Sequence, residues 1–227
     1  MRPLLRLVDR AWFRATWRLS PSRTLHHIRT AVCLDGDGCD FYFDRVDEAL
    51  DLIERYDPGT LDDIRRHFDG ILVMGSERFR LAHWNDNAKL CIITERHLDS
   101  SSTAPEGVAL TLVHENMHAT LCAAGVSYDD GRRAPVEVIC GMAELAFARR
   151  VPYSLGLVER AERRIETWAT SGEDMWSTEA MREATAQHLR ATGAPPWLVK
   201  FVVWLSRVFH RVRPNKGNNI LDTCQVC

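Results

Sequence analysis

The sequence contains no internal repeat, no low-complexity segment and no glycine-rich phosphate-binding loop. It therefore gives no indication of a repeat architecture or of a nucleotide-phosphate site. The first thirty residues lack an uninterrupted apolar run of seven, so we expect no secretory signal. The most apolar stretch, residues 197–205, is interrupted by Lys200 and is too short to span a bilayer. We expect it to form a core helix or to partner the N-terminal helix.

The chain has seven cysteines, an odd number, and we expect no signal peptide. Free thiols in a cytoplasmic protein are the simplest interpretation. Cys224-x-x-Cys227 has no second Cys or His pair nearby, so it predicts no second zinc site. The same four residues fit a prenylation box formally, but the middle positions, Gln225 and Val226, are poor for that modification.

Composition is that of an ordinary globular protein, with 45% hydrophobic and 26% charged residues. We expect one compact unit made of three parts. These are an N-terminal basic helix in residues 1–30, a core in residues 31–155 and a helical extension in residues 156–227. The net charge of -2 is uneven, since both ends of the chain are basic and the middle is acidic. We expect no nucleic-acid partner.

The N-terminal segment, residues 3–19, has a helical pattern with an arginine every fourth position from Arg2 to Arg18. Apolar residues, including Trp12, Phe13 and Trp17, fall largely on the other side. Two interpretations compete: a helix that docks on the acidic body, which we favour, and a helix that lies on a membrane surface.

The sequence His114-Glu115-Asn116-Met117-His118 has the spacing His-Glu-x-x-His. In a helix, His114 and His118 lie on one face, one turn apart, where two imidazoles can hold one zinc ion. Glu115 is offset by about 100° from His114, close to the metal without binding it. That position suits a general base acting on a zinc-bound water.

The context of this motif predicts a buried helix over residues 104–124. Thr103 and Glu106 read as a capping box at its start, and Gly125 as the stop after its end. The alternative is a core helix whose two histidines are satisfied by hydrogen bonds. A glutamate flanked by two histidines on an apolar helix is costly to bury without a partner, which favours zinc.

A third protein ligand is required. The metzincin positions for Gly and a third His are Leu121 and Ala124, which excludes that class. Eighteen residues after His118 comes Glu137, and here the chain resembles the gluzincin metallopeptidases, over about residues 104–150. This resemblance implies that His114, His118 and Glu137 bind zinc (Zn2+) and that Glu115 is catalytic.

Glu137 is expected in the first turn of a second helix that follows Pro135 and runs to about residue 150. Glu144 lies on the same face but about 10.5 Å further along the axis, so the two carboxylates cannot both reach one ion. Glu144 is thus either the fallback ligand or a partner for a histidine ring nitrogen.

Ahead of the motif we expect two short helices, residues 46–56 and 61–68, and three strands, residues 71–74, 78–84 and 89–94, with a hairpin turn at residues 85–87. The aspartate-rich stretch at residues 35–40 lacks the ligands of a calcium loop and reads as a turn. A small antiparallel sheet is also what the resemblance implies, with an edge strand lining the cleft and pairing with extended substrate. After residue 150 we expect helices over residues 157–170, 178–192 and 197–212. These elements predict the α+β class, and the resemblance implies a zincin-like fold.

These observations predict a zinc-dependent hydrolase, a small metallopeptidase that acts on a peptide or protein substrate. The alternative is a non-catalytic zincin-fold protein that binds a partner or regulates it. A donor to the tetrahedral oxyanion is also required. The sequence leaves five candidates for it: Tyr128, His83, His97, Arg132 and Tyr153.

Overall fold

The structure is a computed structural model that describes residues 2–34, 39–75, 81–99, 104–126, 128, 133–152 and 154–170, and residues 186, 196, 197 and 200 singly, with side chains from residue 10 onward. The chain divides into two compact units, Met1–Gly172 and Glu173–Cys227. The expected helices at 178–192 and 197–212 therefore lie, apart from single residues, outside the described part. The first unit includes residues 156–170, which the sequence analysis assigned to a helical extension.

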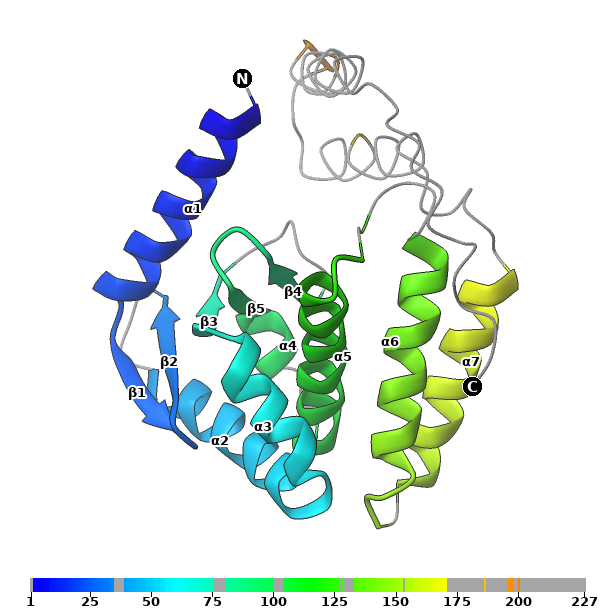
Figure 1. The fold of residues 1–227 in the computed structure, drawn as a ribbon. Helices are drawn as coiled ribbons and strands as arrows, with labels where there is room; N and C mark the ends of the chain where they lie inside the picture. The colour runs from blue at the N-terminus through cyan, green and yellow to red at the C-terminus, as the bar shows by residue number, and fades with distance from the viewer. Residues whose placement is uncertain are drawn as a thin grey trace. The chain divides into compact units, whose positions relative to one another are not determined.

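A five-stranded mixed sheet forms the centre of this α+β unit (Figure 1), in the order β1-β2-β3-β5-β4. The strands are β1 (Ser22–Leu25), β2 (Ile28–Cys33), β3 (Gly70–Met74), β4 (Ala82–Asn85) and β5 (Leu90–Thr94). The central strands β2, β3 and β5 are parallel, and only the edge strands β1 and β4 pair antiparallel.

The expectation of an antiparallel sheet was therefore wrong. Between β2 and β3 the chain passes through α2 (Cys39–Tyr56) and α3 (Pro58–His67). Such a helical crossover returns the chain to its starting end, so that the next strand runs in the same direction. The predicted β4–β5 hairpin is confirmed, and the Asn85 side-chain Oδ1 accepts a hydrogen bond from the Ala88 N–H within its turn.

The first hairpin, β1–β2, was not predicted. Its two-residue turn consists of His26 and His27, whose φ angles are 48° and 66°. Turns with two positive φ angles normally carry Asn or Gly, so a His-His turn gives no recognisable hairpin signal in the sequence.

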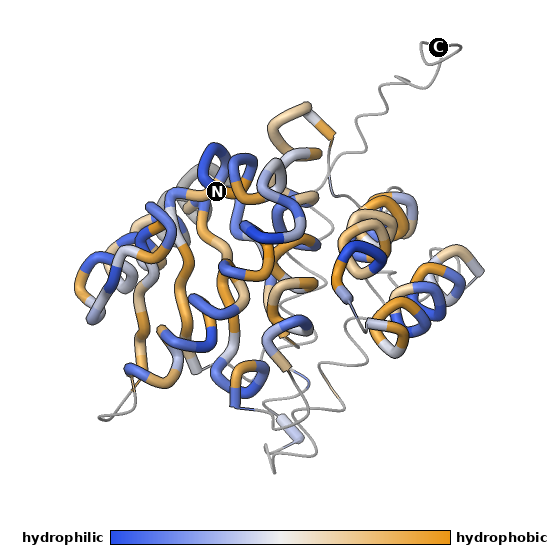
Figure 2. Tube along the Cα trace, turned by 90° about the horizontal axis from the view of Figure 1, so that it is seen from below, coloured by the Kyte–Doolittle hydropathy of each residue, from blue (hydrophilic) through white to orange (hydrophobic). Residues whose placement is uncertain are grey.

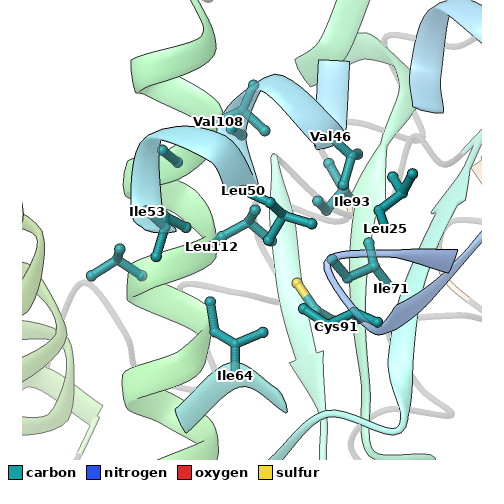
Figure 3. Close-up of a cluster of buried hydrophobic side chains, with 14 of the residues drawn as sticks. Leu25, Val46, Leu50, Ile53, Ile64, Ile71, Cys91, Ile93, Val108 and Leu112 are labelled. Carbon is teal, nitrogen blue, oxygen red and sulfur yellow. The ribbon is translucent and has the colours of Figure 1, made fainter. Parts of the chain in front are cut away.

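Helices α2, α3 and α5 (Pro105–Ala123) cover one face of the sheet. Figure 3 shows Leu50 and Ile53 of α2, Ile64 of α3 and Leu112 of α5 gathered over strand residues such as Ile93. The central strands are hydrophobic along most of their length (Figure 2), as expected for parallel strands buried on both faces. Burial of α5 in this core fixes the helix that carries the His-Glu-x-x-His motif.

The opposite face of the sheet is covered by α1 (Arg2–Leu19). Phe13 is only 8% exposed and packs with Leu72, Leu90 and Ile92. An ion pair of 2.5 Å joins Arg14 to Asp69. The described part of α1 is thus docked on the sheet, the arrangement that the sequence analysis favoured. Among the described helices, none combines the length and the apolarity needed to cross a lipid bilayer.

The described residues form three further helices: α4 (Glu95–Asp99), α6 (Arg133–Ala148) and α7 (Leu155–Thr170). The N-cap of α5 is Ala104, with no side-chain capping bond, so the predicted capping box led by Thr103 was wrong. Pro105 at the first helical position begins the helix instead. Gly125, with a φ of 82°, ends it as predicted.

Helix α6 begins at Arg133, earlier than predicted, because Pro135 is tolerated within the first turn, where no intrahelical N–H bond is needed. Glu137 consequently lies in the second turn of α6 rather than the first. The close approach of α7 depends on Gly141 of α6, since a Cβ built there would lie 2.8 Å from both Ile165 and Trp168.

Candidate metal centre

The two histidines of the motif point their Nε2 atoms at the same place. Both belong to α5, and His118 Nε2 lies 3.1 Å from His114 Nε2. Their rings meet edge to face with centroids 4.8 Å apart. This is the geometry expected from residues one helical turn apart on one face.

Helix α6 brings Glu137 to these two nitrogens. Its Oε2 lies 3.2 Å from His114 Nε2, and its Oε1 lies 3.6 Å from His118 Nε2. Ligands at about 2.0–2.2 Å from a tetrahedral ion are separated from one another by about 3.3–3.6 Å. The donor atoms of the three nominated residues are therefore nearly as far apart as the corners of such a coordination sphere, with one carboxylate oxygen of Glu137 near each histidine.

Glu144, also on α6, lies on the other side of the His114 ring. Its Oε1 is 2.5 Å from His114 Nδ1, and its Oε2 accepts a hydrogen bond of 3.0 Å from Arg164 of α7. Of the two roles left open for Glu144, the geometry matches the partner of a ring nitrogen. A carboxylate in that place fixes the orientation of a ligating imidazole and raises its basicity.

Glu115 is buried beside β4, the edge strand next to α5. The backbone N–H of Trp84 donates a hydrogen bond to its carboxylate. Burial, opposed by the nearby His114 and assisted by Glu137, raises the pKa of Glu115 to about 7. A carboxyl group with that pKa can both accept and release a proton near neutral pH, which is the property required of a general acid–base.

The charges at this place also fit a bound cation. Three buried carboxylates, those of Glu115, Glu137 and Glu144, lie among two histidines and one half-exposed arginine. Burial opposes the charging of His114, but hydrogen bonds to Glu137 and Glu144 raise its pKa to about 10. Burial and the adjacent His114 lower the pKa of His118 to about 4. The proton on His114 already offsets part of the charge of these carboxylates, and a divalent ion bound there would take the place of that proton.

Of the five candidate oxyanion donors, the structure places Tyr128 at the site. Its hydroxyl donates a hydrogen bond to Glu137 Oε1, and its ring lies edge-on to His118 with centroids 5.2 Å apart. His97 is buried beside Thr111, with its Nε2 2.9 Å from the Thr111 hydroxyl. His83 contacts the ring of Phe13, on the face that α1 covers. The remaining two, Arg132 and Tyr153, lie outside the described residues.

Three side chains near the site were not predicted: Cys140 of α6, and Arg164 and Trp168 of α7. The ring centroid of Trp168 lies 5.8 Å from that of His114. The guanidinium carbon of Arg164 lies over the Trp168 ring, 4.9 Å from its centroid. The four-residue spacing of Arg164 and Trp168 indicates one helical face, but only the packing of α7 on α6 shows that this face meets the motif. Cys140 follows Glu137 by three residues, a spacing that also predicts a shared face.

The chain was compared with family models, with curated proteins and with solved structures, and none of the three comparisons gave a match.

Proposed function

We propose that the protein is a zinc-dependent hydrolase, a small gluzincin-like metallopeptidase with a zincin-like core. The observation that carries the proposal is the convergence of His114 Nε2, His118 Nε2 and the Glu137 carboxylate within 3.1–3.6 Å of one another. Two imidazoles and one carboxylate are a donor set typical of catalytic zinc, which keeps a fourth position open. The buried Glu115 next to this set supplies the acid–base group.

Zinc held by these three residues would polarise the scissile carbonyl and lower the pKa of an attacking water toward ~7. Glu115 would accept the proton of that water and deliver it to the leaving amine. Glu144 would hold His114 in one tautomer by accepting its Nδ1–H. Among the described candidates, Tyr128, which contacts Glu137 and His118, would be the donor to the oxyanion.

The edge strand β4 is positioned to align an extended peptide substrate. It forms one border of the sheet, and its Trp84 N–H already binds the Glu115 carboxylate. A peptide that paired with this edge would run past the proposed base. We further propose a cytoplasmic location, which suits the lack of a disulfide among the five cysteines of the described part.

The experiment compares wild type with Glu115→Gln, with Glu106→Gln of the same helix as the matched control. Zinc content is measured by elemental analysis, and hydrolysis by cleavage of a peptide library, with and without a chelator. We expect about one zinc per chain in all three proteins. Cleavage should be lost in Glu115→Gln and in chelated wild type, by at least ~10²–10⁴-fold, and kept in Glu106→Gln.

Two outcomes would overturn the proposal. A protein that neither contains nor takes up zinc would show that the buried histidines and carboxylates are only an ion-pair network. Bound zinc with no cleavage by any form would instead indicate the non-catalytic alternative, in which the fold serves partner binding or regulation.

A further inference from the structure

A fourth possible donor, Cys140, lies beside the proposed ligands. One ring nitrogen of His114, one of His118 and the Cys140 Sγ all lie within 4.8 Å of one another. Cys140 is fully buried and carries a free thiol. It follows Glu137 by three residues on α6, so that both side chains lie on the helix face that meets α5.

We propose that Cys140 is an additional protein ligand, which closes the metal site in its resting state. This inference rests on the zinc site proposed above and adds to it a means of regulation. A Zn–S bond of about 2.3 Å places a tetrahedral sulfur about 3.5 Å from its nitrogen neighbours. The Cys140 sulfur already lies within 4.8 Å of both nitrogens, which is close to that separation.

The number of protein ligands separates two kinds of zinc site. Three ligands leave a position for water and are typical of catalytic sites, whereas four protein ligands form a closed site. When the Cys140 sulfur binds the metal, the thiol proton is released to solvent. When the sulfur dissociates from the metal, it is protonated again. No oxidant or reductant is needed. Water and the Cys140 sulfur therefore compete for one position, and hydrolysis requires the sulfur to leave.

A sulfur ligand also narrows the choice of metal. Thiolates favour zinc and cobalt(II) over magnesium, calcium and manganese. Cobalt(II) is the more informative probe, because a bound thiolate gives a sulfur-to-cobalt charge-transfer absorption that histidine and carboxylate ligands do not give.

The test uses the full chain with Cys224→Ser and Cys227→Ser as background, so that the C-terminal thiols contribute no cobalt–sulfur signal. Cobalt(II) is added to this parent and to two derivatives, Cys140→Ser and Cys122→Ser. Cys122 is the matched control: it is a free thiol on α5, four residues after His118, whose Sγ instead donates to Asp86. Circular dichroism checks that each protein is folded.

We expect the charge-transfer absorption in the parent and in Cys122→Ser, and its complete loss in Cys140→Ser. The visible cobalt absorption should remain in Cys140→Ser, because His114, His118 and Glu137 still bind the ion. Absence of the charge-transfer absorption in a cobalt-loaded parent, or its persistence in Cys140→Ser, would overturn the role of Cys140 and leave the three-ligand site standing. If no folded form binds cobalt(II) or zinc, the proposed function fails as well.

Discussion

Glu144 Oε1 lies 2.5 Å from His114 Nδ1, on the side of the imidazole ring opposite the Nε2 atom that faces Glu137 and His118. Arg164 holds the second oxygen of the same carboxylate. A chain of charges thus runs from α7 through α6 to the motif helix. It orients the imidazole from one side, so that Nε2 faces Glu137 and His118, where the proposed ion would bind.

The two glutamates of α6 should affect zinc affinity to different extents. Glu144→Ala removes the orienting partner and should weaken zinc binding about 10–100-fold. Glu137→Ala removes a proposed direct ligand and should weaken zinc binding more than Glu144→Ala does. Zinc affinity measured by competition with a chelator distinguishes the two. Equal losses would indicate a shared network, and a loss in Glu144→Ala alone would make Glu144 the ligand.

Gly141→Ala should destabilise the protein although alanine favours a helix. The added Cβ would lie 2.8 Å from Ile165 and from Trp168, so α7 must move away from α6, at a cost of about 1–3 kcal/mol. Gly156→Ala in α7 is the control, since a Cβ there meets nothing within 4 Å. Denaturant unfolding of both variants checks this, and a Gly141→Ala protein as stable as the control would contradict the packing.

Stability should fall in acid because of His97. Burial, with Arg164, Arg45 and Arg160 nearby, lowers its pKa from 6.5 to about 4. Between these values the unfolded chain binds more protons than the folded one, so the free energy of unfolding decreases as pH falls from about 6.5 to about 4. His97→Gln should flatten that part of the profile, measured by denaturant unfolding at several pH values. An unchanged slope in the variant would assign the effect to other groups.

Phe13 should anchor α1 to the sheet. Phe13→Ala removes a ring that is almost fully buried and should cost about 3–5 kcal/mol. Trp12→Ala, at a side chain 63% exposed, should change stability by about 0.5 kcal/mol or less. Thermal unfolding separates the two variants. Binding of the intact protein to anionic vesicles, lost at high salt, would instead favour the membrane interpretation of this helix.

The motif helix was predictable because its signals are local. Apolar residues before His114 indicated burial, and the spacing of His114, Glu115 and His118 defined one face. The distance in sequence to Glu137 nominated a ligand on a second helix, and the structure does bring its carboxylate to the two nitrogens.

The direction of the strands and the side chains that support the site were harder to predict from the sequence. The residues of β2 do not determine whether β3 runs parallel or antiparallel to it, because the direction of β3 depends on the helical crossover between the two strands. The β1–β2 hairpin was hidden by a turn built from His26 and His27. Arg164 reaches the site only through the packing of α7 on α6, which local pattern does not encode, whereas the three-residue spacing from Glu137 to Cys140 did indicate a shared face.

The order of these helices along the chain has a consequence for biosynthesis. Both histidines leave the ribosome first on α5, then Glu137, Cys140 and Glu144 on α6, and Arg164 only later on α7. All proposed donors thus emerge from the ribosome before the helix that carries Arg164. An ion bound at that stage would link α5 to α6 during translation, and α7 would then pack on helices that are already joined.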